Sequence, residues 1–105
     1  QGKVNKGVDI AGRLGDSVAS AADGVVVYAG SGLGGYGKLV IVKHDAHFLS
    51  AYGHNRLIFV KEGESVKAGQ IVAEIGSSGS DLAMLHFEIR QDGKPKDPLH
   101  FLPRR

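Results

Sequence analysis

The sequence predicts an all-β domain, built as an antiparallel sandwich or open barrel of short strands. Short β-prone runs alternate with turn signals along the chain, and the periodicity of helices is almost absent. The chain also holds 16 glycines among 105 residues. Glycine supplies turns and weakens helix interiors, so its abundance favours the same fold class.

Six runs are predicted to form strands because they are rich in β-branched, aromatic and other apolar residues. In chain order they cover residues 25–29, 38–44, 49–54, 57–60, 71–75 and 85–90. The glycine-rich segments between them are predicted to be turns or loops, at residues 30–37, 62–69 and 76–79. Several short strands with frequent turns are typical of sandwiches and barrels.

Length and composition indicate a single folded domain over residues 1–105. Apolar residues make up 42% of the chain and charged residues 23%, as in ordinary globular domains. The net charge of +2, without aromatic residues among the basic ones, argues against nucleic-acid binding. No apolar run reaches the roughly 18 residues of a membrane-spanning helix. Because the chain starts at Gln1 and not at methionine, we expect it to be the C-terminal part of a longer protein.

The segment 84–90 is predicted to have one apolar and one polar face, because alternate side chains of a strand point to opposite sides. The face expected to meet the core carries Leu85, Phe87 and Ile89. The other face carries Met84, His86, Glu88 and Arg90. Neighbours on one face are about 6.5–7 Å apart, which lets one bind a metal while the next reaches a substrate. The alternative interpretation is a solvated polar face with a chance histidine.

Two other segments carry polar residues of the same kinds. Asn5 and Asp9 are four residues apart, so they share a face if the segment is extended. Asp9 lies between Val8 and Ile10, an unusual place for a carboxylate without a partner. His54 lies near the end of a predicted strand.

Together these segments resemble the LytM-type, or lysostaphin-like, zinc endopeptidases. The resemblance runs from Asn5 to Pro103 and includes ADGVVVYAG, GYGKLVIVKH, EGESVKAGQIVAEIGSSG and LHFEIR. Each segment is weakly specific, whereas the ordered set at these spacings is strongly specific. The resemblance implies the antiparallel, duplicated-hybrid-like β fold of these peptidases.

Active members of that family use a His-x-x-x-Asp motif and a His-x-His motif around zinc. The resemblance implies that Asp9 and His86 match two zinc ligands and that His54 matches a catalytic histidine. Asn5 stands at the position of the third ligand, and Met84 at that of the other catalytic histidine. A neutral amide is a poor zinc ligand, and a thioether transfers no proton. The resemblance therefore implies vestigial ligands, no cofactor and no hydrolysis.

Without its metal, the family's substrate groove is expected to bind a partner. Its floor is expected to include Asn5, Asp9, Tyr36, Tyr52, His54, Met84 and His86. Tyrosine and methionine are good anchors for a protein partner. The alternative is that Tyr36 and Tyr52 cap the core, with their hydroxyls in water.

Within this family, the motifs NKGVDIAG, LSAYGHN, VKAGQ, MLHFEIR and DPLHFLP are most similar to degenerate division factors of the NlpD and EnvC type, above all the NlpD type. The resemblance implies a periplasmic domain, tethered to the outer membrane through an upstream lipidated segment. It implies an activator of an AmiC-like N-acetylmuramoyl-L-alanine amidase in daughter-cell separation, with peptidoglycan as a second partner. Two alternatives stay open: an active zinc endopeptidase with replacement ligands, and a plain peptidoglycan-binding module.

Overall fold

A computed structural model describes residues 7–77, 83–92 and 94–96. Every regular element in these ranges is a strand, which confirms the predicted all-β class. The strands are β1 (Val8–Ala11), β2 (Ser17–Ala19), β3 (Gly24–Gly30), β4 (Lys38–Lys43), β5 (Phe48–Ile58), β6 (Ser65–Val66), β7 (Ile71–Ile75), β8 (Met84–Gln91) and β9 (Lys94–Lys96). Over the described residues we find no helix with the length and apolar character needed to cross a membrane.

The predicted runs match β3, β4, β7 and β8 closely, whereas β5 differs from its prediction. The sequence suggested two strands, at residues 49–54 and 57–60, but the structure has one continuous strand from Phe48 to Ile58. The chain passes a register shift between Asn55 and Leu57 without turning, so the two predicted runs belong to one strand. The short strands β1, β2, β6 and β9 are not among the predicted runs, and β6 lies within residues 62–69, which were predicted to be a turn or loop.

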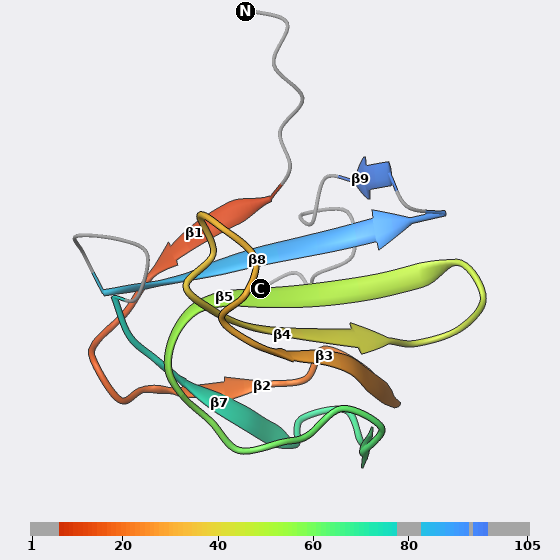
Figure 1. The fold of residues 1–105 in the computed structure, drawn as a ribbon, viewed down its shortest axis with the longest axis horizontal. Coiled ribbons are helices and arrows are strands. Elements are labelled where there is room, and N and C mark those ends of the chain that lie inside the picture. Colours follow the sequence, from red (N-terminus) through yellow and green to blue (C-terminus); the bar gives the residue numbers. More distant parts are fainter. Residues whose placement is uncertain (1–6, 78–82, 93, 97–105) are drawn as a thin grey trace, which may run out of the picture.

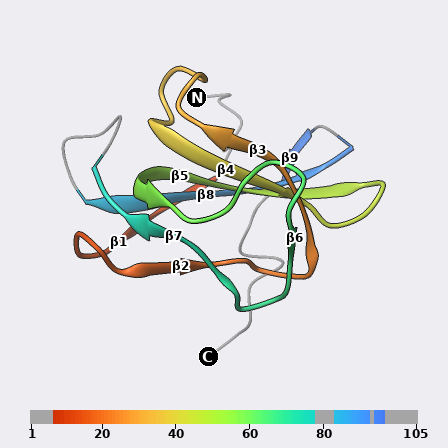
Figure 2. The same ribbon diagram turned by 60° about the horizontal axis from the view of Figure 1, so that its bottom comes forward.

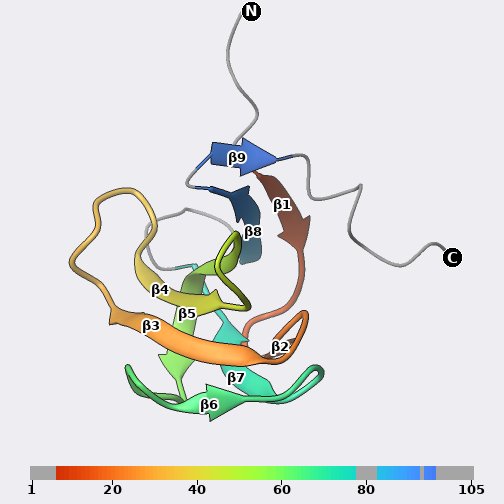
Figure 3. The ribbon, with the colours of Figure 1, turned by 90° about the vertical axis from the view of Figure 1, so that its right-hand side faces the viewer.

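Strand β5 joins the two layers of the fold. Its first part pairs with β4 and β8, and its second part pairs with β7, which in turn pairs with β2. The main ladder has the order β1-β8-β5-β4-β3-β6, and its pairs are antiparallel. In Figures 1 and 2, β2 and β7 lie beneath β8, β5 and β4. Figure 3 shows β1 and β9 flanking β8.

The hydrophobic core fills the space between the layers and consists largely of valines. Tyr52 from β5 and Phe87 from β8 contribute its aromatic rings, which lie 5.5 Å apart between centroids. The predicted core face of β8 is confirmed: Phe87 and Ile89 are buried, and Leu85 packs against the core from a half-buried position. The opposite face of β8 therefore carries the polar residues of the candidate site.

Candidate functional site

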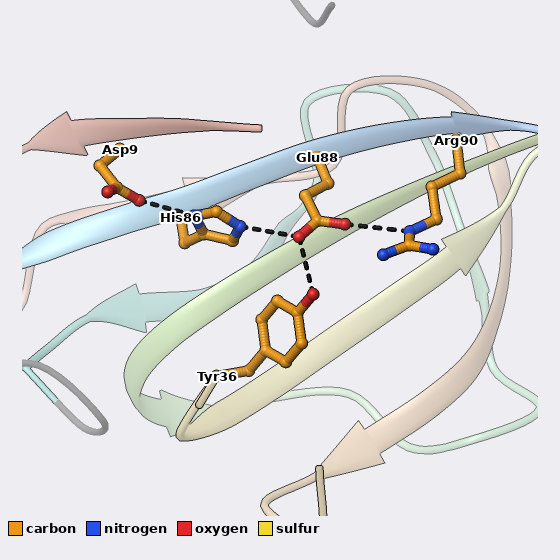
Figure 4. Close-up of polar contacts among 5 residues, drawn as sticks. All are labelled: Asp9, Tyr36, His86, Glu88 and Arg90. Carbon is orange, nitrogen blue, oxygen red and sulfur yellow. Dashed lines mark hydrogen bonds and ion pairs between the residues drawn. The ribbon is translucent and has the colours of Figure 1, made fainter. Parts of the chain in front are cut away.

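Five polar side chains meet on the outer face of β8, and we call them the polar cluster. Figure 4 shows them: Asp9, Tyr36, His86, Glu88 and Arg90. The sheet register places Asp9 of β1 directly opposite His86 of β8. Strand alternation places residues 86, 88 and 90 on one face, and Tyr36 joins them from a loop.

His86 lies between two carboxylates. Its Nδ1 is 2.6 Å from Oδ1 of Asp9, and its Nε2 is 2.7 Å from Oε2 of Glu88. Carboxylates only accept hydrogen bonds, so both ring nitrogens donate when the ring is protonated. The hydrogen bond to Glu88 raises the pKa of His86 most, burial opposes it, and Asp9 adds to the rise. The arrangement favours the imidazolium form.

Glu88 is the buried centre of the polar cluster, with an exposed fraction of 1%. Its Oε2 accepts hydrogen bonds from His86 and from the Tyr36 hydroxyl, the latter at 2.9 Å, and its Oε1 accepts one from Nε of Arg90 at 3.0 Å. Burial raises the pKa of Glu88, but the bonds from His86, Tyr36 and Arg90 outweigh it, so the pKa lies below its ordinary value. The buried carboxylate is therefore held in its charged form.

Tyr36 enters the cluster from the glycine-rich loop between β3 and β4. Its ring lies 5.6 Å from that of His86 between centroids. Burial, and then the hydrogen bond to Glu88, raise the pKa of the Tyr36 hydroxyl, so it stays a donor. The Tyr36 carbonyl also accepts a hydrogen bond from the backbone N–H of His54 at 2.7 Å. The loop thus reaches the cluster through both a side chain and the main chain.

His54 reaches the same face through an unusual backbone conformation. It has a φ of 65°, which is uncommon for a residue other than glycine. Regular alternation would place its side chain on the face of Tyr52, toward the core. In the left-handed conformation its ring instead lies 5.9 Å from that of His86, edge to face. The two histidines that the sequence singled out are therefore neighbours.

Tyr52 is not at the site, and the prediction that it lines the groove is wrong. Its side chain is 1% exposed and belongs to the core, because it lies opposite Phe87 in the β5–β8 register. Its hydroxyl accepts a hydrogen bond from the backbone N–H of Ala21 at 2.8 Å and lies 2.7 Å from Oγ of Ser50. The alternative interpretation, that Tyr52 belongs to the core, agrees with the structure, except that protein groups and not water bond its hydroxyl.

Met84 and Asn5 complete the predicted set. Met84 begins β8 opposite Ala11 and is half-buried, and its backbone N–H donates to the Gly76 carbonyl at 3.1 Å. By alternation it shares the face of His86. Asn5 lies outside the described residues. The structure therefore brings together Asp9, Tyr36, His54 and His86. Met84 lies two residues before His86 in β8.

The donor set can be tested against the zinc site that the family resemblance implies. A catalytic zinc site needs three protein ligands and an open position. Asp9 and His86 would supply two metal donors, and their contacting atoms are 2.6 Å apart. Glu88 accepts a hydrogen bond from the other ring nitrogen of His86, as does the carboxylate that orients a ligating histidine in metal sites. Within residues 7–77, 83–92 and 94–96, no three histidine, cysteine or acidic residues form a group that could hold a metal. The described residues alone do not fit a catalytic zinc ion.

The fold and this site define the class of protein: the chain belongs to Peptidase family M23, which it matches over residues 3–98. It is 62% identical over 104 residues to the Lipoprotein NlpD/LppB homolog of Pseudomonas aeruginosa, covering 99% of this chain and 35% of that protein. It is 54% identical over 101 residues to the Murein hydrolase activator NlpD of Escherichia coli (strain K12), covering 96% of this chain and 27% of that protein. The chain thus spans about a third or less of the length of these relatives.

Among solved structures, the chain is similar to the catalytic domain of lysostaphin, an antimicrobial peptidase from Staphylococcus simulans. The TM-score is 0.86 at 31% identity, over 92% of this chain and 77% of that chain. These comparisons confirm the predicted LytM-type family and the resemblance to NlpD-type proteins.

Proposed function

We propose that this domain is a non-catalytic activator of a cell-wall amidase, an AmiC-like N-acetylmuramoyl-L-alanine amidase, in the periplasm. The observation that carries the proposal is the donor set on this face, where Asp9 and His86 are the two described residues that correspond to zinc ligands of the family, one fewer than a catalytic site needs. Asn5 and Met84, in place of two histidines, support it from the sequence. Relatives named murein hydrolase activators support the choice of partner.

The names of other relatives support the proposed location. Several are called lipoproteins, and one is the outer membrane antigenic lipoprotein B of Haemophilus influenzae. We infer that the domain works in the cell envelope, tethered to the outer membrane by a lipidated segment upstream. There it acts in peptidoglycan hydrolysis and daughter-cell separation.

The mechanism is a shift between two states of the amidase. A ligand moves such an equilibrium only by its difference in affinity for the two states. The face that carries the polar cluster binds the amidase better in its open state than in its autoinhibited state. An ordered surface loses little conformational entropy on binding, and the bonds around Glu88 order this one.

The test is amidase activity on dye-labelled sacculi, with the purified chain added at increasing concentration and its own zinc content measured in parallel. We expect stimulated release of dye by the amidase, no release by the chain alone and less than stoichiometric zinc. Stoichiometric zinc with cleavage of muropeptide cross-links would identify an active endopeptidase instead. Pelleting with sacculi without stimulation would identify a plain peptidoglycan-binding module.

A further inference from the structure

A hollow adjoins the polar cluster on the outer face of β4, β5 and β8. It has a volume of about 310 Å³ and is lined mainly by aliphatic side chains from three segments. Leu39 and Ala51 are buried and form its floor, whereas Leu33, 45% exposed, forms a wall from the loop before β4. Ile41 and Leu49 complete the apolar lining. This volume lies within the range of small ligand pockets and accommodates one large side chain.

Arg90 gives this apolar pocket a cationic edge. Its Nε donates to Oε1 of Glu88 (Figure 4), and this bond fixes the guanidinium. Both residues line the pocket. Nε–H is one of five N–H donors of the group, and the other four belong to its terminal nitrogens. Two terminal N–H groups match the geometry of a carboxylate and bind it through parallel hydrogen bonds.

The charge around the pocket also favours an anion. Glu88 is shared between His86 and Arg90 and is fully buried, so it does not neutralise Arg90 alone. The nearest other carboxylate of the cluster, Asp9, is bonded to the far side of His86. The end of the cluster at the pocket therefore presents positive charge.

We propose that this pocket is the specificity site for the partner amidase, receiving a large apolar side chain while Arg90 binds a neighbouring carboxylate of the same segment. The inference rests on the proposed function and names the part of the face that selects the partner. A protein segment fits better than peptidoglycan, because stem peptides offer carboxylates but no large apolar side chain to fill a leucine-lined pocket. Hot spots of interfaces are typically such desolvated pockets with an arginine nearby.

The experiment compares the purified chain with two pocket variants and one control. Leu33→Asp places a carboxylate at the pocket mouth, and Arg90→Gln removes the cation. Leu14→Asp is the matched control, because Leu14 is also an exposed loop leucine, 61% exposed, and does not line the pocket. The Kd for the purified amidase, its stimulation and the pelleting of each variant with sacculi are measured, with circular dichroism as the check on folding.

We expect Leu33→Asp and Arg90→Gln each to weaken amidase binding by about tenfold or more, and Leu14→Asp to change it by less than about twofold. Arg90→Gln should also flatten the dependence of Kd on salt. Arg90→Gln also removes a hydrogen bond to the buried Glu88 and can disturb the fold. Leu33→Asp leaves that bond in place, so it tests the pocket independently.

Two outcomes overturn the inference while leaving the proposed function intact. One is that both pocket variants stimulate the amidase as well as the unmodified chain does. The other is a loss of sacculus pelleting in both variants with unchanged amidase affinity, which would assign the pocket to peptidoglycan. Failure of the unmodified, folded chain to bind or stimulate the amidase overturns the proposed function, and this inference with it.

Discussion

Oε2 of Glu88 lies 2.7 Å from Nε2 of His86, and this bond joins the two ends of the polar cluster. On one side, His86 continues to Asp9, and we infer from the family resemblance that this pair stands at two metal-ligand positions. On the other, Glu88 holds Arg90 at the edge of the apolar pocket. The carboxylate is buried, and its three donors compensate the cost of its desolvation.

Replacing Glu88 with glutamine should lower the pKa of His86. The hydrogen bond to Glu88 is the largest cause that raises it, and a neutral amide favours the imidazolium far less than a carboxylate. The measurement is an NMR titration of the imidazole ring protons in chelator-treated buffer. His47 is an internal control, because it is exposed and bonded to Asp92 elsewhere, so its raised pKa should not change. An unaltered His86 titration in Glu88→Gln would contradict the assigned contact.

The same bond predicts how stability depends on pH. The folded-state pKa of His86 is raised above the unfolded value of about 6.5, so its contribution is complete below about pH 6.5 and is lost as the pH rises through the folded pKa. Urea unfolding at several pH values should therefore give a difference between the unmodified chain and His86→Gln that shrinks as the pH rises above about 6.5. His47, also with a raised pKa, is present in both chains and cancels in the difference. If the difference in the free energy of unfolding between the two chains grew with pH in this range, it would contradict the raised pKa of His86.

Much of the fold could be predicted because it depends on local pattern. Alternation along residues 84–90 gave the core face of β8, and the turn signals located β3, β4 and β7. The break predicted within β5 was wrong because a register shift, which a sequence pattern does not reveal, carries the strand past Asn55. Short strands such as β6 form only because a partner strand is present, so propensity alone does not find them.

The candidate site was predictable only where a motif marked it. Asp9 and His86 stood out from their neighbours, and the register places them opposite each other. Glu88 was assigned only to a polar face, since its partner Tyr36 is 52 residues away in the sequence and a local pattern does not reveal their contact. A carboxylate two residues from both a histidine and an arginine on one face was the available signal. The position of His54 depends on its left-handed backbone, which strand alternation does not predict.

If Asn5 and Met84 stand where active relatives have histidines, as the family resemblance implies, histidine at both positions should give the chain a metal site. In the double variant Asn5→His with Met84→His, the first change supplies a third ligand beside Asp9 and His86, and the second supplies an imidazole that can transfer a proton. Zinc content after dialysis, measured by mass spectrometry, should rise from well below stoichiometric to near one ion per chain. Binding should weaken at acidic pH, because ligands must lose their protons first. Met84→His alone, the matched control, should gain little zinc.

The same change, tyrosine to phenylalanine, at Tyr36 and at Tyr52 distinguishes the role of the polar cluster from that of the core. Tyr52→Phe removes the hydroxyl that accepts from the Ala21 N–H and should cost about 1–2 kcal/mol in the free energy of unfolding, measured in urea. It should leave amidase stimulation unchanged at temperatures where the variant is folded, since Tyr52 is buried. Tyr36→Phe removes a donor to Glu88 at the pocket wall and should lower stimulation. Equal loss of stimulation in the two folded variants would mean that the amidase contacts the domain elsewhere.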